Sequence, residues 1–380
     1  MPRGGQACYF WGMNAPDILH CKSFADLPLP RAGGVVYVVK EGQDGGLVTF
    51  LASKGFEVDT LVVSAATLDD YCGVTVRQLP VATRLTVAVG GFAAMEVGKL
   101  LAHKHGLPLW CVPTDYTAAS ALWCHTLWTV GKTPTFVGTD GHTTLVVDNL
   151  LSATRDGTQQ VYQHLFAYYA AAVDDVCRNR MCGTEQANVG LRQAAQTAHT
   201  ALSAVDEYTD EAGKTLWTAL ETCAGVTDTK ETELLSLAIC VYKKGNMSYN
   251  RYTFAAAYAR AVALSEHRDL PDLYLPPDRC AVQETTRALG WETLPSAPTE
   301  DLRRLDWVWR DYLPDLQTAF ADAGRMARCW RRLAGDAGYG YFEDLTAAEV
   351  VALLPVVADM SPTYSPFRHL YLRGGFNLFV

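Results

Sequence analysis

The feature that most constrains the fold is an alternation of short apolar segments with helical segments over the first 150 residues. The apolar segments are rich in β-branched side chains and several are bounded by glycine or proline; they comprise residues 35–39, 61–63, 85–89 and 109–112. Residues 47–52 and 93–105, which lie between them, have the apolar spacing of helices. Apolar strands that alternate with helices are typical of a mostly parallel sheet covered on both faces. The sequence therefore predicts an α/β domain over residues 1–150.

The composition changes after Asp148. Residues 159–266 are rich in alanine, leucine and polar helix formers and contain few β-branched runs. Prolines at 271, 276 and 277 interrupt this series, and further helical patterns cover residues 299–334 and 346–358. We therefore expect an all-α domain over residues 151–380.

Composition and charge narrow the class of protein. Of the 380 residues, 49% are hydrophobic and 19% charged, which is typical of a globular chain. The net charge is −9, so a nucleic acid is not expected as a partner, because an acidic surface repels phosphate backbones. No apolar stretch is long enough for a membrane-spanning helix, so no transmembrane segment is expected.

The eleven cysteines bear on the compartment. Their number is odd, no CxxC pair occurs, and several, such as Cys111 and Cys240, lie within apolar runs. Buried, reduced thiols explain this pattern better than a disulfide framework does. The first residues have no long apolar segment, so no secretory signal is expected. We expect an intracellular, reducing compartment, either the mitochondrion or the cytoplasm.

The segment 85–120 is the most informative about function. It reads as a strand, a glycine turn, a helix, a second strand and a Val-Pro-Thr turn. A glycine turn before a helix allows backbone amides to approach a pyrophosphate. The segment resembles the dehydroquinate-synthase-like superfamily, which includes iron-containing alcohol dehydrogenases and glycerol-1-phosphate dehydrogenases. The pattern of that superfamily is GGGSxxDxxK followed by a strand that ends in VPT.

The match is residue by residue. Gly90, Gly91 and Lys99 fit the pattern, Glu96 replaces the aspartate, and Val112-Pro113-Thr114 are in place. The resemblance implies a Rossmann-like domain with an all-helical domain after it, and NAD(P) as the possible cofactor. The residues that it implies for a degenerate dinucleotide site are Gly90, Gly91, Glu96, Lys99 and Thr114.

Two residues depart from the pattern within the glycine turn. Phe92 replaces the third glycine and Ala93 replaces the serine, so a benzyl group is expected where phosphates should pass close to the backbone. Two interpretations stay open. The turn could bind a dinucleotide, or Gly90 and Gly91 could merely turn the chain while Lys99 is a solvated helix residue.

The resemblance also implies a divalent metal held by one carboxylate and two or three histidines. The matching positions here are Asp174, Tyr252 and Ala256, of which only Asp174 suits the site, because neutral tyrosine is a poor ligand for zinc and alanine is none. Of nine histidines, only His267 lies between residues 200 and 368. We therefore expect these positions to be vestigial, with no metal, no catalytic residues and no cofactor.

An arginine- and tryptophan-rich block near the C-terminus allows two interpretations. It could be a salt-bridged helix pair whose tryptophans enter the core, or a protein-interaction face, because Trp and Arg dominate interface hot spots. The candidate contact residues there and in the apolar tail are Trp307, Trp309, Arg310, Phe376 and Phe379.

Two functions follow from these patterns. The first is a non-catalytic relative that serves as a structural or accessory subunit of a larger intracellular assembly with other protein subunits. The alternative is an active NAD(P)-dependent enzyme of the superfamily that acts on a polyol or a sugar phosphate.

Overall fold

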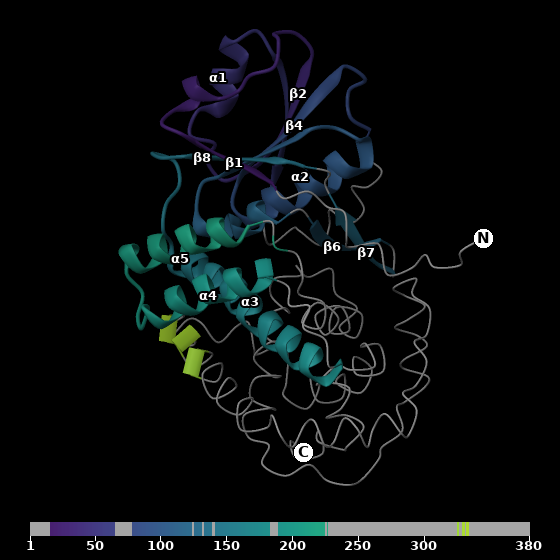
Figure 1. Cartoon of the computed structure of the whole chain (residues 1–380). Coiled ribbons are helices and arrows are strands. Elements are labelled where there is room, and N and C mark those ends of the chain that lie inside the picture. The colour runs from purple at the N-terminus through teal and green to yellow at the C-terminus, as the bar shows by residue number, and fades with distance from the viewer. Residues whose placement is uncertain are drawn as a thin grey trace, which may run out of the picture. The chain divides into compact units, whose positions relative to one another are not determined.

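Figure 1 shows the computed structural model of the chain. The structure describes residues 16–64, 78–123, 125–130, 133–138, 141–182, 189–224, 226, 325–326, 329–330 and 332–333. By their contacts these residues form two compact units. One unit contains the described residues up to Val161 together with Tyr208 to Ala224. The other contains Tyr162 to Glu207, Val226 and the described residues from 325 onward.

A six-stranded sheet forms the centre of the first unit. Its strands lie in the order β1-β8-β5-β4-β2-β3, and every neighbouring pair is parallel. Their bounds are Asp17–Cys21 for β1, Val35–Glu41 for β2, Glu57–Val63 for β3, Thr83–Gly90 for β4, Leu109–Pro113 for β5 and Thr143–Val147 for β8. The predicted parallel sheet is thereby confirmed.

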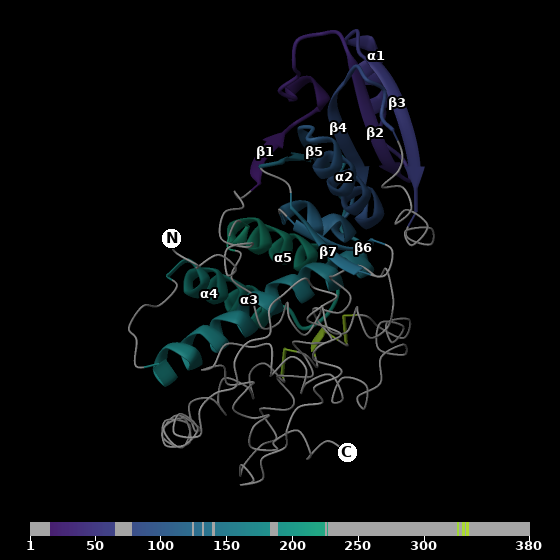
Figure 2. The ribbon, with the colours of Figure 1, turned by 90° about the vertical axis from the view of Figure 1, so that its right-hand side faces the viewer.

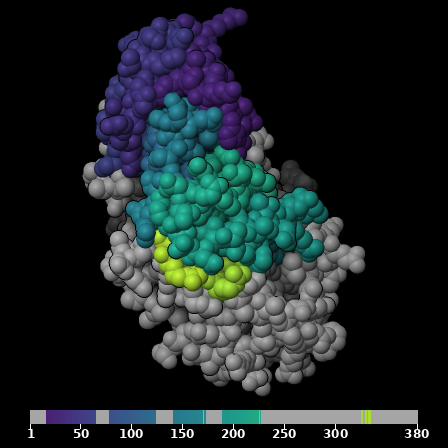
Figure 3. All heavy atoms as spheres, turned by 90° about the vertical axis from the view of Figure 1, so that its left-hand side faces the viewer, coloured from purple at the N-terminus to yellow at the C-terminus, as the bar shows by residue number. Residues whose placement is uncertain are grey.

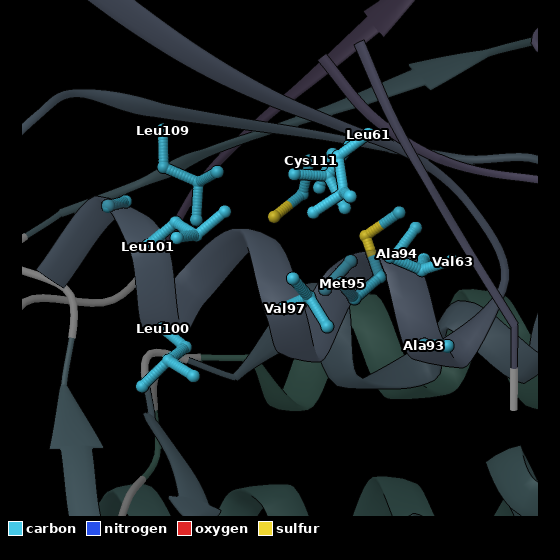
Figure 4. Close-up of a cluster of buried hydrophobic side chains, with 14 of the residues drawn as sticks. Leu61, Val63, Ala93, Ala94, Met95, Val97, Leu100, Leu101, Leu109 and Cys111 are labelled. Atoms are coloured by element: carbon cyan, nitrogen blue, oxygen red, sulfur yellow. The ribbon is translucent and has the colours of Figure 1, made fainter. Parts of the chain in front are cut away.

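Helices cover both faces of this sheet (Figures 1 and 2). Because side chains alternate along a strand, Tyr37 and Val39 of β2 face one side and Val36 and Val38 face the other. The first side packs on α2, Phe92–His105, and includes Leu61, Val63, Leu109 and Cys111; the close-up in Figure 4 shows them against Met95, Val97 and Leu101. The second side packs on α1, Leu47–Ser53, through Leu47 and Leu51. These two apolar layers fix the ends of β2, β4 and β5, where the candidate site lies.

Several elements were not predicted from the sequence. β1 adds an edge strand beside β8. A separate antiparallel hairpin consists of β6, His125–Val130, and β7, Thr133–Gly138. Two 3-10 helices, η1 and η3, span Phe24–Asp26 and Tyr116–Leu122.

Three longer helices follow the sheet: α3, Arg155–Cys182; α4, Val189–Ser203; and α5, Asp210–Cys223. They confirm the predicted change to helical structure. α5 belongs to the same compact unit as the sheet, and its exposed side forms part of the green surface in Figure 3. The division of the chain into domains 1–150 and 151–380 remains a prediction.

In the second unit the described residues near the C-terminus pack inward. The Tyr162 hydroxyl donates to the Met326 carbonyl at 2.9 Å, and the Cys329 thiol donates to the Val205 carbonyl at 2.9 Å. Trp330 is buried, as expected for a tryptophan that enters the core. Trp307, Trp309, Arg310, Phe376 and Phe379 lie outside the described residues, so their role as contact residues stays a prediction.

The α/β fold with a Rossmann-like first part and helices after it is therefore confirmed. Cys21, Cys111, Cys223 and Cys329 are buried, as expected of interior thiols. Over the described ranges, no helix has both the length and the apolar character needed to cross a membrane.

Candidate functional site

The candidate site begins where β2 and β4 end side by side. The two strands are parallel neighbours, and the last residues of each, Glu41 and Gly90, meet at the carboxyl edge of the sheet. Gly90 has φ of 131°, and a Cβ added there would collide with the Glu41 carbonyl oxygen. Position 90 therefore requires glycine both for its backbone conformation and for the closeness of β2. Ligands of open α/β sheets bind at this edge.

The next residue, Gly91, leaves a space that three polar side chains surround. A Cβ at Gly91 would lie 2.6 Å from the Thr117 hydroxyl oxygen, 3.1 Å from Glu41 Oε2 and 3.4 Å from Asp115 Oδ2. Thr117 and Asp115 follow β5, and Asp115 caps η3 by accepting the Thr117 amide at 2.7 Å. Two carboxylates and a hydroxyl thus surround the start of α2.

These side chains satisfy the amides at the start of α2. The first residues of a helix carry N–H groups without an intrahelical acceptor. The Phe92 amide donates to the Thr117 hydroxyl oxygen at 3.3 Å. The Ala93 and Ala94 amides both donate to Glu41 Oε2, at 2.7 and 3.3 Å. The Met95 amide makes the first intrahelical bond, to the Gly91 carbonyl at 3.4 Å. Of the donors that could receive a phosphate, those of Phe92, Ala93 and Ala94 are thus already bound by the protein itself.

The two charged residues of the sequence motif lie elsewhere on α2. Glu96 and Lys99 are 3% and 0% exposed, and Lys99 Nζ lies 3.5 Å from Glu96 Oε1. Lys99 also donates to the Ser120 carbonyl at 2.5 Å. The interpretation of Lys99 as a solvated helix residue is wrong, because its ammonium group is desolvated and bound inside the fold. It ties α2 to η3.

The carbonyl next to Ser120 anchors a second part of the fold. The Ala121 oxygen accepts from His142 Nε2 and from the Thr144 hydroxyl, each at 2.6 Å. Burial and the nearby Lys99 charge lower the pKa of His142 to about 4. The imidazole is therefore neutral near pH 7, and its Nε2–H donates to the carbonyl.

Aromatic stacking also joins η3 to α5. The Tyr116 and Trp217 rings stack at 5.0 Å between centroids and 12° between planes. Trp217 Nε1 donates to Glu221 Oε1 at 2.7 Å, and His20 Nε2 lies 3.4 Å from Glu221 Oε2. α5, which contacts β1 through Glu221, thereby holds η3, and η3 carries Thr117 to the start of α2.

The structure brings together only part of the predicted site. Gly90, Gly91 and Thr114 are adjacent, and the Thr114 amide donates to the Gly90 carbonyl at 3.1 Å. Phe92 is partly buried and packs against the apolar layer under α2. The groups that fill the turn are Glu41 and Thr117, which sequence reasoning missed. The only feature of the sequence that points to them is that each follows soon after a predicted strand, 35–39 for Glu41 and 109–112 for Thr117.

The implied metal positions fall mostly outside the described residues. Asp174 lies within α3, but its side chain is not described, and neither Tyr252 nor Ala256 is in the described ranges. In the described part of the chain, no three His, Cys, Asp or Glu side chains group closely enough to hold a metal ion. On chemistry alone, Tyr252 and Ala256 do not fit the histidine pair that the resemblance implies.

The turn fits a dinucleotide poorly. A pyrophosphate at the start of α2 needs free amides, and three of these amides donate to Thr117 or Glu41. It would also meet the negative charge of Glu41 beside that of Asp115. A phosphate bound to the Ala93 and Ala94 amides would have to displace the Glu41 carboxylate from them.

Comparison with known proteins identifies the fold. No protein-family model matches the sequence, and no curated protein is significantly similar to it. A mutant of an archaeal, halo-thermophilic alcohol dehydrogenase from a Red Sea brine pool is similar in structure, with a TM-score of 0.58, 10% identity and coverage of 97% of this chain and 98% of the other.

A second similar structure is the iron-containing alcohol dehydrogenase of Thermococcus thioreducens. Its TM-score is 0.53 at 12% identity, with coverage of 97% of this chain and 99% of the other. At this identity the likeness concerns the fold alone, and it agrees with the resemblance that residues 85–120 carry. The chain therefore has the fold of the iron-containing alcohol dehydrogenases.

Proposed function

We propose that this chain is a non-catalytic relative of the dehydrogenases whose fold it has, and that it serves as a structural or accessory subunit of a larger intracellular assembly. The observation that carries the proposal is the closed start of α2. Its amides donate to Glu41 and Thr117, so the turn that would hold a dinucleotide is filled by the protein. Without a dinucleotide the fold has no hydride carrier.

The charged residues of the motif support the same proposal. Lys99 and Glu96 are buried and paired with each other, and Lys99 is bound to the Ser120 carbonyl. Both therefore contribute to the packing of α2 on η3. In the helical part, the chain has Tyr252 and Ala256 where the resemblance implies metal-binding histidines. A metal site that polarises a substrate oxygen needs such ligands.

The second candidate is an active NAD(P)-dependent enzyme that acts on a polyol or a sugar phosphate. The observation that favours it is the retained frame of Gly90, Gly91 and Thr114 at the carboxyl edge of a parallel sheet. Dinucleotides bind at such an edge in many α/β proteins. The similar structures are also named as alcohol dehydrogenases, one of them iron-containing.

Turnover assays separate the two candidates. The purified chain is incubated with NAD⁺ or NADP⁺, a panel of polyols and polyol phosphates, and Fe²⁺ or Zn²⁺, while absorbance of the reduced nicotinamide is followed. The non-catalytic proposal expects no metal-dependent signal above that of a denatured sample. Metal-dependent reduction with any substrate of the panel would overturn it in favour of the enzyme.

The subunit role needs a separate experiment. Affinity purification of the tagged full chain from its own cells, followed by size-exclusion chromatography, should recover it in a complex much larger than 41.6 kDa. Elution as a monomer from gently lysed mitochondria and cytosol would contradict the role. Fractionation of the same cells decides between the two compartments.

A further inference from the structure

We propose that Glu41 is an internal substitute for a phosphate: its carboxylate occupies the start of α2 and excludes polyphosphate ligands from it. This inference deepens the proposed function and concerns the same site. It makes a single side chain responsible for closing the turn, so it can be tested by changing that residue alone.

The Glu41 carboxylate lies at the start of α2. Glu41 Oε2 accepts the amides of Ala93 and Ala94, the second and third residues of α2. These are the amides that an N-cap side chain usually satisfies. The N-cap residue here is Gly91, which makes no side-chain cap. The acceptor comes instead from β2, 52 residues earlier in the sequence than Ala93.

With no side chain at Gly91, Glu41 Oε2 and the Thr117 hydroxyl can both approach the turn, at 3.1 and 2.6 Å from where a Cβ would be. A glycine at this place is also what permits a pyrophosphate to approach the backbone. The space beside the Gly91 backbone is retained, and the Glu41 carboxylate occupies it.

The partial positive charge at the start of a helix favours an anion, whether a carboxylate or a phosphate. A phosphate that competes for this place must displace Glu41 and then lie beside its charge and that of Asp115. Removing the Glu41 carboxylate frees two amides and removes one of the two negative charges. The variant should therefore gain affinity for polyphosphates.

The test uses inorganic pyrophosphate as the probe and the full chain as the protein. Isothermal titration calorimetry compares wild type, Glu41→Ala, Glu41→Gln and Glu57→Ala. Glu57 is exposed at the start of β3, where it is paired with Val35 at the amino end of β2, the far end of that strand from Glu41. Its variant therefore changes the net charge equally at a distance. We expect Glu41→Ala to bind at least tenfold more tightly than wild type or Glu57→Ala. Glu41→Gln, which keeps an acceptor near the amides, should gain less.

A second readout locates the binding. In amide NMR spectra, pyrophosphate should shift the Ala93 and Ala94 signals of Glu41→Ala and leave those of wild type in place. If Glu41→Ala does not fold, Glu41→Gln must still bind more tightly than wild type and Glu57→Ala. Equal affinity of wild type and the folded Glu41 variants would overturn the inference. An equal gain in Glu57→Ala would do the same, since it would trace the effect to net charge.

Failure here is distinguishable from failure of the proposed function. If no Glu41 variant gains affinity and wild type shows no turnover, the inference fails and the non-catalytic role stands. If wild type reduces a dinucleotide, the proposed function fails whatever the pyrophosphate titration gives.

Discussion

Removing the ammonium of Lys99 should destabilise the fold strongly. Lys99 is 0% exposed, and its Nζ lies 3.5 Å from the carboxylate of Glu96, which is 3% exposed. It also donates to the Ser120 carbonyl at 2.5 Å. Lys99→Met keeps the volume of the side chain but leaves a buried carboxylate without this cation. Breaking a buried ion pair from one side costs about 3–5 kcal/mol, and the lost bond to Ser120 is part of that cost.

The double variant Glu96→Gln with Lys99→Met provides the comparison. It removes both charges of the buried pair, so it should recover about 2 kcal/mol or more relative to Lys99→Met alone. Lys104→Met, an exposed lysine on the same helix, should change stability by less than about 0.5 kcal/mol. Urea unfolding followed by circular dichroism measures all three. A Lys99→Met variant within about 1 kcal/mol of wild type would refute the reasoning, because it would mean that the pair is not desolvated as the structure has it.

Three further predictions concern the surroundings of η3. Because the pKa of His142 is lowered to about 4, the folded state binds fewer protons than the unfolded state between pH 6.5 and 4. The free energy of unfolding should therefore fall by up to about 3 kcal/mol as the pH drops through that window. In His142→Gln this part of the pH dependence should be absent. Gly213→Ala places a Cβ 2.9 Å from the Tyr116 ring and should lower stability by about 1–3 kcal/mol in thermal unfolding; an unchanged midpoint would contradict the close packing. Trp217→Phe keeps the stack on Tyr116 but removes the 2.7 Å donor to Glu221, and should cost about 1–2 kcal/mol in urea unfolding.

The sequence predicted the layers of the fold because these depend on local patterns. The alternation of apolar runs and helices predicts a sheet covered on both faces, and the apolar run 35–39 supplies side chains to both: Val36 and Val38 to one, Tyr37 and Val39 to the other. The strand β1 and the hairpin β6–β7 were missed. Residues 17–21 contain only a short apolar stretch, so their place beside β8 depends on tertiary pairing and not on local preference.

The candidate site was predicted only in part for a related reason. Gly90 and Gly91 are visible as a local motif, but the acceptor of the Ala93 amide, Glu41, comes from another strand. Nothing in the residues around Glu41 indicates that it reaches α2. The burial of Lys99 was also missed, because its partner, the Ser120 carbonyl, lies 21 residues away in η3. The sequence placed the obstacle to a dinucleotide at Phe92, whereas the structure shows the amides filled by Glu41 and Thr117.

The central claim is that the start of α2 is closed to dinucleotides in the native chain. Calorimetric titration of the wild-type protein with NAD⁺, NADH, NADP⁺ and NADPH, with and without Zn²⁺, tests it most directly. We expect no heat of binding for any of the four at concentrations that saturate a dehydrogenase. Stoichiometric binding of any of them in the micromolar range would contradict it, since Glu41 would then yield its place on the Ala93 and Ala94 amides to a phosphate.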